Sequence, residues 1–125
     1  MENVIATLTE LFEGIVPESH FLSNPSADVL YPYLVFSYEA EQREWGQDGA
    51  YIDVDIFDNR GENQERIEFL LGQLKRELEH KAVMAEDFYL RLRYEGSNPL
   101  DTLSDVLQRR HARFYVTIDW RREYE

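Results

Sequence analysis

The segment from Gly49 to Leu78 constrains the fold more than any other part of the chain, because its hydrophobic period changes once within it. Between Ala50 and Asp58, aliphatic side chains alternate with charged or aromatic ones, which is the pattern of a strand with one buried face. After the turn residues DNRG, the apolar residues recur three or four positions apart and predict an amphipathic helix. The segment therefore predicts a strand that leads directly into a helix, with the two apolar faces packed together.

The rest of the chain adds a first helix and three more strands by the same reasoning. Hydrophobic periodicity predicts a helix over residues 3–12, strands over 31–38, 88–95 and 112–120, and a short helix or turn-rich segment over 100–107. Residues 20–31 contain a Ser-Asn-Pro-Ser cluster and are predicted to form a loop. The order α-β-β-α-β-short α-β predicts a single α+β domain over residues 1–125. We expect a two-layer sandwich in which two main helices cover one face of a mainly antiparallel four-stranded sheet.

Composition limits the classes of function that the chain can have. It contains no cysteine, which excludes disulfides, thiolate zinc sites and cysteine nucleophiles. No apolar run reaches the roughly 20 residues that span a bilayer, and the acidic N-terminal segment predicts no signal peptide, so we expect a cytoplasmic protein. The net charge of −12 should repel nucleic acid and anionic membranes. The explanation that we prefer for this charge is solubility, and the alternative is a surface that repels or mimics DNA.

Asp53, Asp55 and Asp58 are the strongest candidates for a metal or acid–base site. The first two point the same way along a strand, roughly 7 Å apart, and carboxylates are the ligands of Mg²⁺ and Ca²⁺. The run lacks the glycine and loop of an EF-hand, and arginines on other strands explain the acids as cross-strand ion pairs, the interpretation that we prefer. The three histidines lack metal-site spacing, and no phosphate-binding or nucleophile motif is present. We therefore predict no enzymatic activity, no metal and no cofactor.

The second face of the predicted sheet combines aromatic residues with charged ones. Tyrosine and arginine are enriched at subunit interfaces, although β-propensity alone explains aromatic residues on strands equally well. Trp45, in the charged hairpin tip from Glu39 to Asp48, is expected either to fold back onto the sheet or to contact a partner. The candidate interface residues are Trp45, Tyr51, Phe57, Tyr89, Arg91, Arg93, Arg113 and Tyr115.

The chain resembles the tail terminator (tail completion) proteins of long-tailed bacteriophages, a family of small head–tail joining components. The resemblance covers most of the chain and is carried by an N-terminal helix followed by YPYLVFSYE, YIDVDIFDNRGENQERIEFLLGQL and RRHARFYVTIDWR. It lies in pattern and length. It implies a virion protein, assembled in the host cytoplasm into a ring that is usually a hexamer. Such a ring caps the tail tube and joins it to the head connector, and DNA passes through it.

The family supplies no catalytic residues. For this chain we also expect no membrane contact and no specific nucleic-acid binding. Ring closure requires head-to-tail contacts between copies, and the aromatic face and the hairpin tip are the candidates for them. The resemblance also implies an acidic lumen to which DNA does not adhere; the candidates for it are Glu39, Glu41, Glu44, Asp53 and Asp55. The alternatives are another head–tail connector or neck protein and, from a different class, a small acidic carboxylate-metal enzyme or a DNA-mimic inhibitor.

Overall fold

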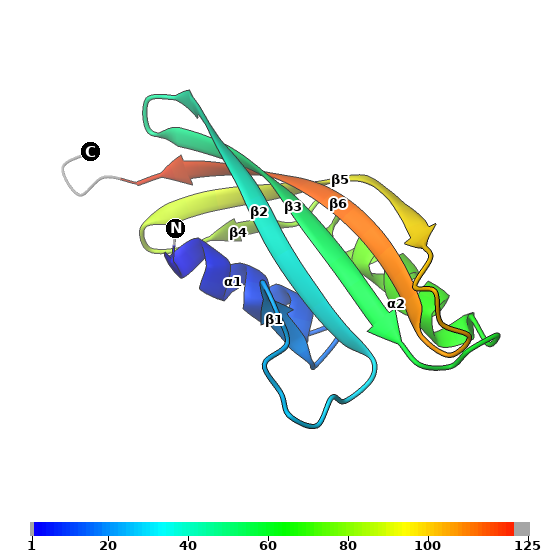
Figure 1. Cartoon of the computed structure of the whole chain (residues 1–125). Coiled ribbons are helices and arrows are strands. Elements are labelled where there is room, and N and C mark those ends of the chain that lie inside the picture. Colours follow the sequence, from blue (N-terminus) through cyan, green and yellow to red (C-terminus); the bar gives the residue numbers. More distant parts are fainter. Residues whose placement is uncertain (1, 122–125) are drawn as a thin grey trace.

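In the computed structural model, the chain forms a curled six-stranded sheet, a half-barrel, with both helices on the same side (Figure 1). The structure describes residues 2–121, and at 42–44 it describes the backbone alone. No helix in this range is both long and apolar enough to cross a membrane. The elements in chain order are α1 (Glu2–Glu13), β1 (Ser19–Phe21), β2 (Tyr33–Glu44), β3 (Gln47–Asp58), α2 (Glu65–Leu78), β4 (Ala82–Met84), β5 (Phe88–Leu100) and β6 (Gln108–Trp120).

The strands are arranged in the order β1-β2-β3-β6-β5-β4. The pair β1–β2 is parallel, and every other neighbouring pair is antiparallel. The last strand, β6, lies between β3 and β5, which therefore run parallel to each other. The centre of the sheet is thus complete only when the C-terminal strand has paired on both sides.

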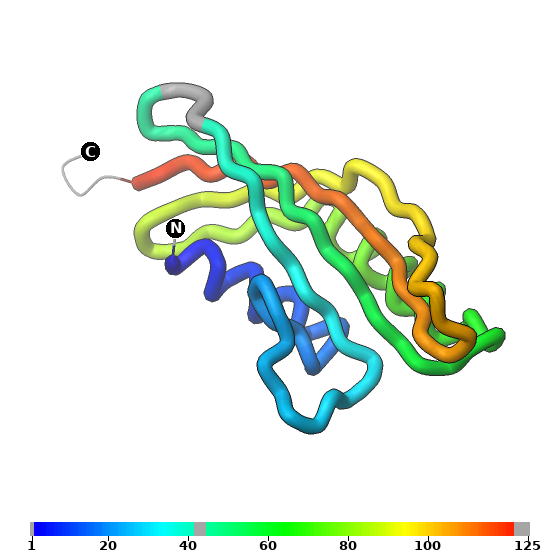
Figure 2. Tube along the Cα trace, in the orientation of Figure 1, coloured from blue at the N-terminus to red at the C-terminus, as the bar shows by residue number. Residues whose placement is uncertain are grey.

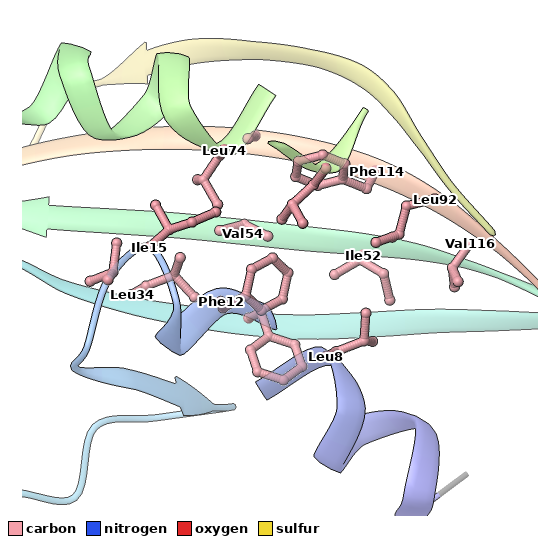
Figure 3. Close-up of a cluster of buried hydrophobic side chains, with 14 of the residues drawn as sticks. Leu8, Phe12, Ile15, Leu34, Ile52, Val54, Leu74, Leu92, Phe114 and Val116 are labelled. Carbon is pink, nitrogen blue, oxygen red and sulfur yellow. The ribbon is translucent and has the colours of Figure 1, made fainter. Parts of the chain in front are cut away.

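The predicted strand–turn–helix is confirmed, and its apolar faces form the core. Ile52, Val54 and Ile56 of β3 are buried, and α2 buries a stripe that includes Leu74. Figure 3 shows how side chains of α1, such as Phe12, meet the inner face of the sheet in this cluster. The Phe12 ring is fully buried, and its centroid lies 4.9 Å from that of Phe36 on β2.

The sheet differs from the predicted four-stranded, mainly antiparallel sheet, although the chain is α+β with two helices. It has six strands and is mixed, because the three-residue strands β1 and β4 extend its two edges. β1 forms partly within residues 20–31, which were predicted to be a loop. Strands this short show no hydrophobic period, and the parallel pairing of β1 with β2 leaves no local signal in the sequence.

Of the two alternatives predicted for residues 100–107, the short helix is wrong and an irregular segment with bends is present instead. β5 ends at Leu100, an irregular loop follows, and β6 begins at Gln108, four positions before the predicted start at residue 112. β5 continues through Pro99 because a bulge near Gly96, where φ is 129°, shifts its register against β6. β4 covers only the first part of β5, so Pro99 lies in an edge strand, where a missing N–H is tolerated.

Candidate interaction face of the sheet

The side of the sheet that faces away from the helices carries most of the residues predicted as an interface. Side chains on a strand alternate between faces, so the alternation that buries the even-numbered residues of β3 directs Tyr51 and Asp53 outward. The register then places Tyr51 beside Tyr115 and Asp53 beside Arg113. We call this surface the outer face. Its members are Tyr33, Val35, Ser37, Glu39, Glu41, Tyr51, Asp53, Asp55, Phe57, Tyr89, Arg91, Arg93, Glu95, Arg109, His111, Arg113, Tyr115, Thr117 and Asp119.

Two tyrosines form the centre of the outer face. The rings of Tyr51 and Tyr115 meet edge to face with their centroids 4.9 Å apart, an arrangement that the aromatic quadrupole favours. The guanidinium carbon of Arg113 lies 4.1 Å from the Tyr51 centroid, and that of Arg93 lies 5.2 Å from the Tyr115 centroid. The Tyr115 hydroxyl donates a 2.9 Å hydrogen bond to Glu41 Oε1. The centre is therefore a layer of rings and guanidinium groups that hold one another in place.

Both aspartates of the outer face contact arginine and histidine side chains of β6. Asp53 Oδ1 lies 3.2 Å from His111 Nε2 and 3.4 Å from Arg113 Nε, the latter without the alignment of a hydrogen bond. Asp55 Oδ1 accepts a 3.2 Å hydrogen bond from Arg109 Nε and lies 3.3 Å from His111 Nδ1. The contacts with Arg109 and Arg113 are cross-strand ion pairs, which stabilise a sheet mildly. Among the side chains that the structure describes, no group of three or more acidic or histidine residues is placed to hold a metal ion.

Similar contacts continue the pattern towards both ends of the strands. At one end, Phe57 stacks on Tyr33 with centroids 4.8 Å apart, and the guanidinium carbon of Arg109 lies 5.5 Å from the Phe57 centroid. At the other end, Asp119 accepts a 3.3 Å hydrogen bond from Arg91 Nη2. Each outward aromatic ring of β3 therefore lies beside an arginine of β6.

The structure places the predicted interface residues in two locations. Trp45 lies in the turn between β2 and β3 and exposes 85% of its surface. The remaining seven lie together on the outer face: Tyr51, Phe57, Tyr89, Arg91, Arg93, Arg113 and Tyr115.

The residues predicted to line an acidic lumen are also divided. Asp53 and Asp55 lie in the middle of the outer face among cations. Glu39 and Glu41 lie on β2, next to one margin of the sheet, and are exposed. The side chain of Glu44 lies outside the described residues.

Tyr33, Arg109 and His111 are among the members of the outer face that sequence reasoning missed. The predicted last strand began at residue 112, so Arg109 and His111 fell outside it. The alternation of β6 continues back to Gln108 without interruption, and extending it would have found both residues. Tyr33 belongs to the face because it pairs with Phe57 on β3. The sequence around Tyr33 does not specify this register.

Asp58, the third candidate for metal binding, does not belong to the outer face. Its side chain is fully buried and accepts two hydrogen bonds from Arg66, one of them from Nε at 2.7 Å. Burial alone would raise the pKa of the Asp58 carboxyl. The hydrogen bonds from Arg66 and the Asn59 N–H, with the charges of Arg66 and Arg60, outweigh burial and hold this pKa below its ordinary value. Asp58 therefore ties the end of β3 to the first turns of α2.

The outer face holds little of the excess negative charge of the chain. Its six carboxylates face four arginines and His111, and most of these groups are paired. Most of the net charge of −12 therefore lies on the helices and loops. α1, for example, carries three glutamates and no basic residue.

No protein-family model matches the chain, and no curated protein matches it. Among solved structures, the chain is similar to one chain in the virion of a native gene transfer agent (GTA) particle, with a TM-score of 0.66. The superposition covers 87% of this chain and 84% of the other, at 9% sequence identity. At this identity the likeness shows a shared fold, which extends over most of both chains.

Proposed function

We propose that this chain is a structural protein of a virion and that it acts as a tail terminator rather than as an enzyme. The observation that carries the proposal is the fold that it shares with a chain of the GTA virion. The sequence resemblance to tail terminator proteins supports the same class of assembly. In this role a ring of six copies caps the tail tube, joins it to the head connector and requires no cofactor.

A protein that joins two assemblies needs a binding surface at each end. Turns and loops connect the strands at both ends of this sheet (Figure 2), and apolar side chains are exposed in or next to them. At the end that carries the β2–β3 turn, Trp45 and Met84 are 85% and 66% exposed. At the opposite end, Leu30 before β2 and Leu103 in the β5–β6 loop are 60% and 94% exposed. Tryptophan is among the residues that carry most of the binding energy at interfaces, which favours Trp45 in particular. These two ends are our candidates for contacts with the tail tube and the head connector.

The loop that presents Leu103 is held in a defined shape. Leu103 has a φ of 60°, a left-handed conformation that costs a leucine about 1–2 kcal/mol. Thr102 Oγ1 donates a 2.6 Å hydrogen bond to the carbonyl of Leu107, and Ser104 Oγ accepts hydrogen bonds from the N–H groups of Val106 and Leu107. Backbone strain and an exposed apolar side chain thus coincide at Leu103, as they also do at Leu22, which has a φ of 70° and is 64% exposed. Such strain clusters at functional sites.

The net charge of −12 suits a protein that surrounds DNA in transit. An acidic wall repels phosphates, so DNA does not adhere to it during passage. We assign this repulsion mainly to the helices and loops, because Asp53 and Asp55 are already paired with cations.

Removal of the chain from the particle tests the proposed function. Tube growth without a terminator lacks a stop, so particles made without the chain should have tails of uneven length that are not joined to heads. The wild-type chain should restore joined tails of uniform length, whereas Trp45→Ala or Leu103→Asp should not. Phe69→Ala, which changes an exposed residue of α2 that belongs to neither group, is the control and should restore them.

Two results separate the proposal from its rivals. Tails of normal length that remain detached from heads would favour a neck or connector protein. Normal, joined tails in the absence of the chain would contradict a structural role in the joint.

A further inference from the structure

Both margins of the sheet are unpaired over part of their length. β2 has twelve residues, but β1 pairs only with its residues 34–36. β5 has thirteen residues, and β4 pairs only with residues 89–91. In the part of the chain that the structure describes, no strand lies beside residues 37–44 of β2 or 93–100 of β5. These open stretches are sites at which another strand or chain could dock.

The open margin of β2 presents backbone groups for pairing. The N–H of Leu34 donates to the carbonyl of Glu18, and the carbonyl of Phe36 accepts from the N–H of Leu22, both at 2.8 Å. Backbone groups on a strand alternate in direction. The N–H and C=O groups of Tyr38 therefore point to the same open side, beyond the end of β1.

The two margins carry opposite charges at the same level along the strands. The register aligns two rows across the outer face: Glu39, Tyr51, Tyr115 and Arg93 in one, and Glu41, Gly49, Thr117 and Arg91 in the other. Each row begins with a glutamate on β2 and reaches an arginine on β5. Arg93 is the last residue of the first row, whereas the second row continues beyond Arg91 to Ala82 on the short strand β4. The side chains of Arg91 and Arg93 are 52% and 64% exposed, and both glutamates are exposed.

Contacts within the chain orient the charged groups of both margins. Arg93 Nε donates a 2.7 Å hydrogen bond to Glu95 Oε2, and Arg91 donates to Asp119. On the other margin, Glu41 is held by the Tyr115 hydroxyl. One carboxylate partner of this kind leaves other guanidinium N–H groups of each arginine available to a second acceptor.

We propose that a second copy of this chain docks the Glu39 and Glu41 margin of its β2 against the Arg91 and Arg93 margin of the first copy. Cyclic symmetry rotates copies about an axis without moving them along it. In a ring whose axis runs along the strands, complementary groups on the two margins must therefore lie at the same level, as they do in these two rows. β2 and β5 run in opposite directions, so the margins meet as antiparallel neighbours.

This contact rests on the proposed ring and names the surfaces that close it. Each copy uses its acidic margin with one neighbour and its basic margin with the other, which makes the interface head-to-tail. The remaining edge of β5 contains the bulge at Gly96 and Pro99, features that discourage further strand pairing. Charge pairing at Arg91 and Arg93 therefore sets the register of the contact.

Charge reversal tests the contact through the molar mass in solution, measured by light scattering over a wide concentration range. The wild-type chain should form oligomers, and either Glu39→Arg with Glu41→Arg or Arg91→Glu with Arg93→Glu should raise the dissociation constant at least about tenfold. The quadruple variant, which exchanges the two margins, should recover most of the loss. Glu10→Arg with Glu13→Arg makes the same charge change as the Glu39 and Glu41 pair, at exposed residues of α1 that belong to neither margin, and should have no effect. Raising the salt from about 0.1 M to about 1 M shortens the screening length from about 10 Å to about 3 Å and should weaken the wild-type oligomer.

Engineered cysteines give a second test, which does not depend on how strongly the substitutions weaken the oligomer. The chain has no cysteine of its own, so only the introduced thiols can form disulfides. In Glu39→Cys with Arg93→Cys, three strand spacings of about 4.8 Å separate the two positions within one copy, well beyond the reach of a disulfide. Oxidation should therefore link copies into a ladder of multimers. Glu10→Cys with Arg93→Cys is the control and should not form the ladder.

The proposal is overturned by a wild-type chain that stays monomeric up to about 1 mM and gives no ladder. It is also overturned by reversed margins that leave the molar mass unchanged. Failure of the contact and failure of the proposed function are distinguishable. If particles need the chain for joined tails but reversal of its margins leaves the molar mass unchanged, the proposed function stands and the proposed contact is wrong. If particles form normal, joined tails without the chain but reversal of its margins lowers the molar mass, the proposed contact stands and the proposed function is wrong.

Discussion

The guanidinium group of Arg113 lies over the ring of Tyr51, with its central carbon 4.1 Å from the ring centroid. The same group lies 3.4 Å from Asp53, two residues further along β3 and on the same face. One side chain of β6 therefore contacts both an aromatic ring and a carboxylate of β3. The outer face is in this sense a connected set of cross-strand contacts, and its rings and charges should be energetically coupled.

We expect the coupling between Tyr51 and Arg113 to appear in a double-mutant cycle. Tyr51→Ala and Arg113→Ala should show a coupling of about 0.5–1 kcal/mol, the range for exposed cation–π pairs. Urea denaturation followed by circular dichroism measures the required free energies of unfolding. Tyr89 and Arg91, with the guanidinium carbon 5.9 Å from the centroid, form the matched control pair and should couple more weakly. Equal coupling in the two pairs would contradict the geometry.

Asp58→Asn should destabilise the fold although Asp58 touches neither margin of the sheet. The change leaves Arg66 without its buried carboxylate partner. We expect a loss of about 2–3 kcal/mol, below the range for fully buried pairs because the Arg66 side chain is 34% exposed. Asp28→Asn, in an exposed loop, is the control and should change the free energy of unfolding by less than about 0.5 kcal/mol. A neutral result at Asp58 would refute its structural role.

The same residue should make stability depend on pH in acid. Because the pKa of folded Asp58 lies below its ordinary value of 3.8, the unfolded chain binds the proton first as the pH falls. The contribution of Asp58 is therefore complete above the unfolded pKa and is lost as the pH falls through the folded pKa. Unfolding measured between about pH 5 and pH 2 should show a shallower loss of stability in Asp58→Asn than in the wild type. Parallel curves would show that the charged form has no special stabilisation.

Substitution by alanine should have different effects on stability at a buried and at an exposed phenylalanine. Phe12 is fully buried between α1 and the sheet, so Phe12→Ala should cost about 3–5 kcal/mol. Phe69 on α2 is 60% exposed, so Phe69→Ala should change the free energy of unfolding by no more than about 0.5 kcal/mol. Chemical denaturation of both variants measures the difference. Similar losses would place α2 in a different orientation on the sheet.

Two glycines should respond in opposite directions to replacement by alanine. Gly61 has a φ of 62°, and a Cβ there would lie 3.3 Å from the carbonyl oxygen of Asp105, so Gly61→Ala should cost about 1–2 kcal/mol. Gly72 lies within α2, where the nearest atom to a Cβ belongs to the flexible Arg76 side chain. Gly72→Ala should stabilise the fold by up to about 1 kcal/mol through helix propensity. Thermal unfolding distinguishes the two signs, and a stabilised Gly61→Ala would contradict the turn geometry.

The parts of the fold that the sequence predicts are those with a sustained period. β3 and α2 follow from the alternation of Ile52, Val54 and Ile56 and from the helical spacing that ends at Leu78. β1 and β4 were not predictable, because three residues show no period and their pairing depends on distant strands. The continuation of β5 through Pro99 was hidden because proline is a strand breaker except at an edge, and the sequence does not specify the strand order.

The candidate face was predictable in composition but not in its contacts. Alternation on β3 and β6 identified the outward tyrosines, arginines and aspartates as one surface. The partner of each aspartate depends on the register between strands more than fifty residues apart, as for Asp55 and Arg109. The same alternation places Asp58 on the buried side of β3. Arg66, in the first turns of α2, supplies the charge that allows this carboxylate to be buried.

Cryo-electron microscopy of particles assembled with the wild-type chain tests the central claim most directly. The account predicts a ring at the end of the tail next to the head, with an open channel. Each subunit of the ring should match the six-stranded fold, with the β2 margin against the β5 margin of its neighbour. Particles that lack the chain, or that carry it only away from the head–tail joint, would contradict the account.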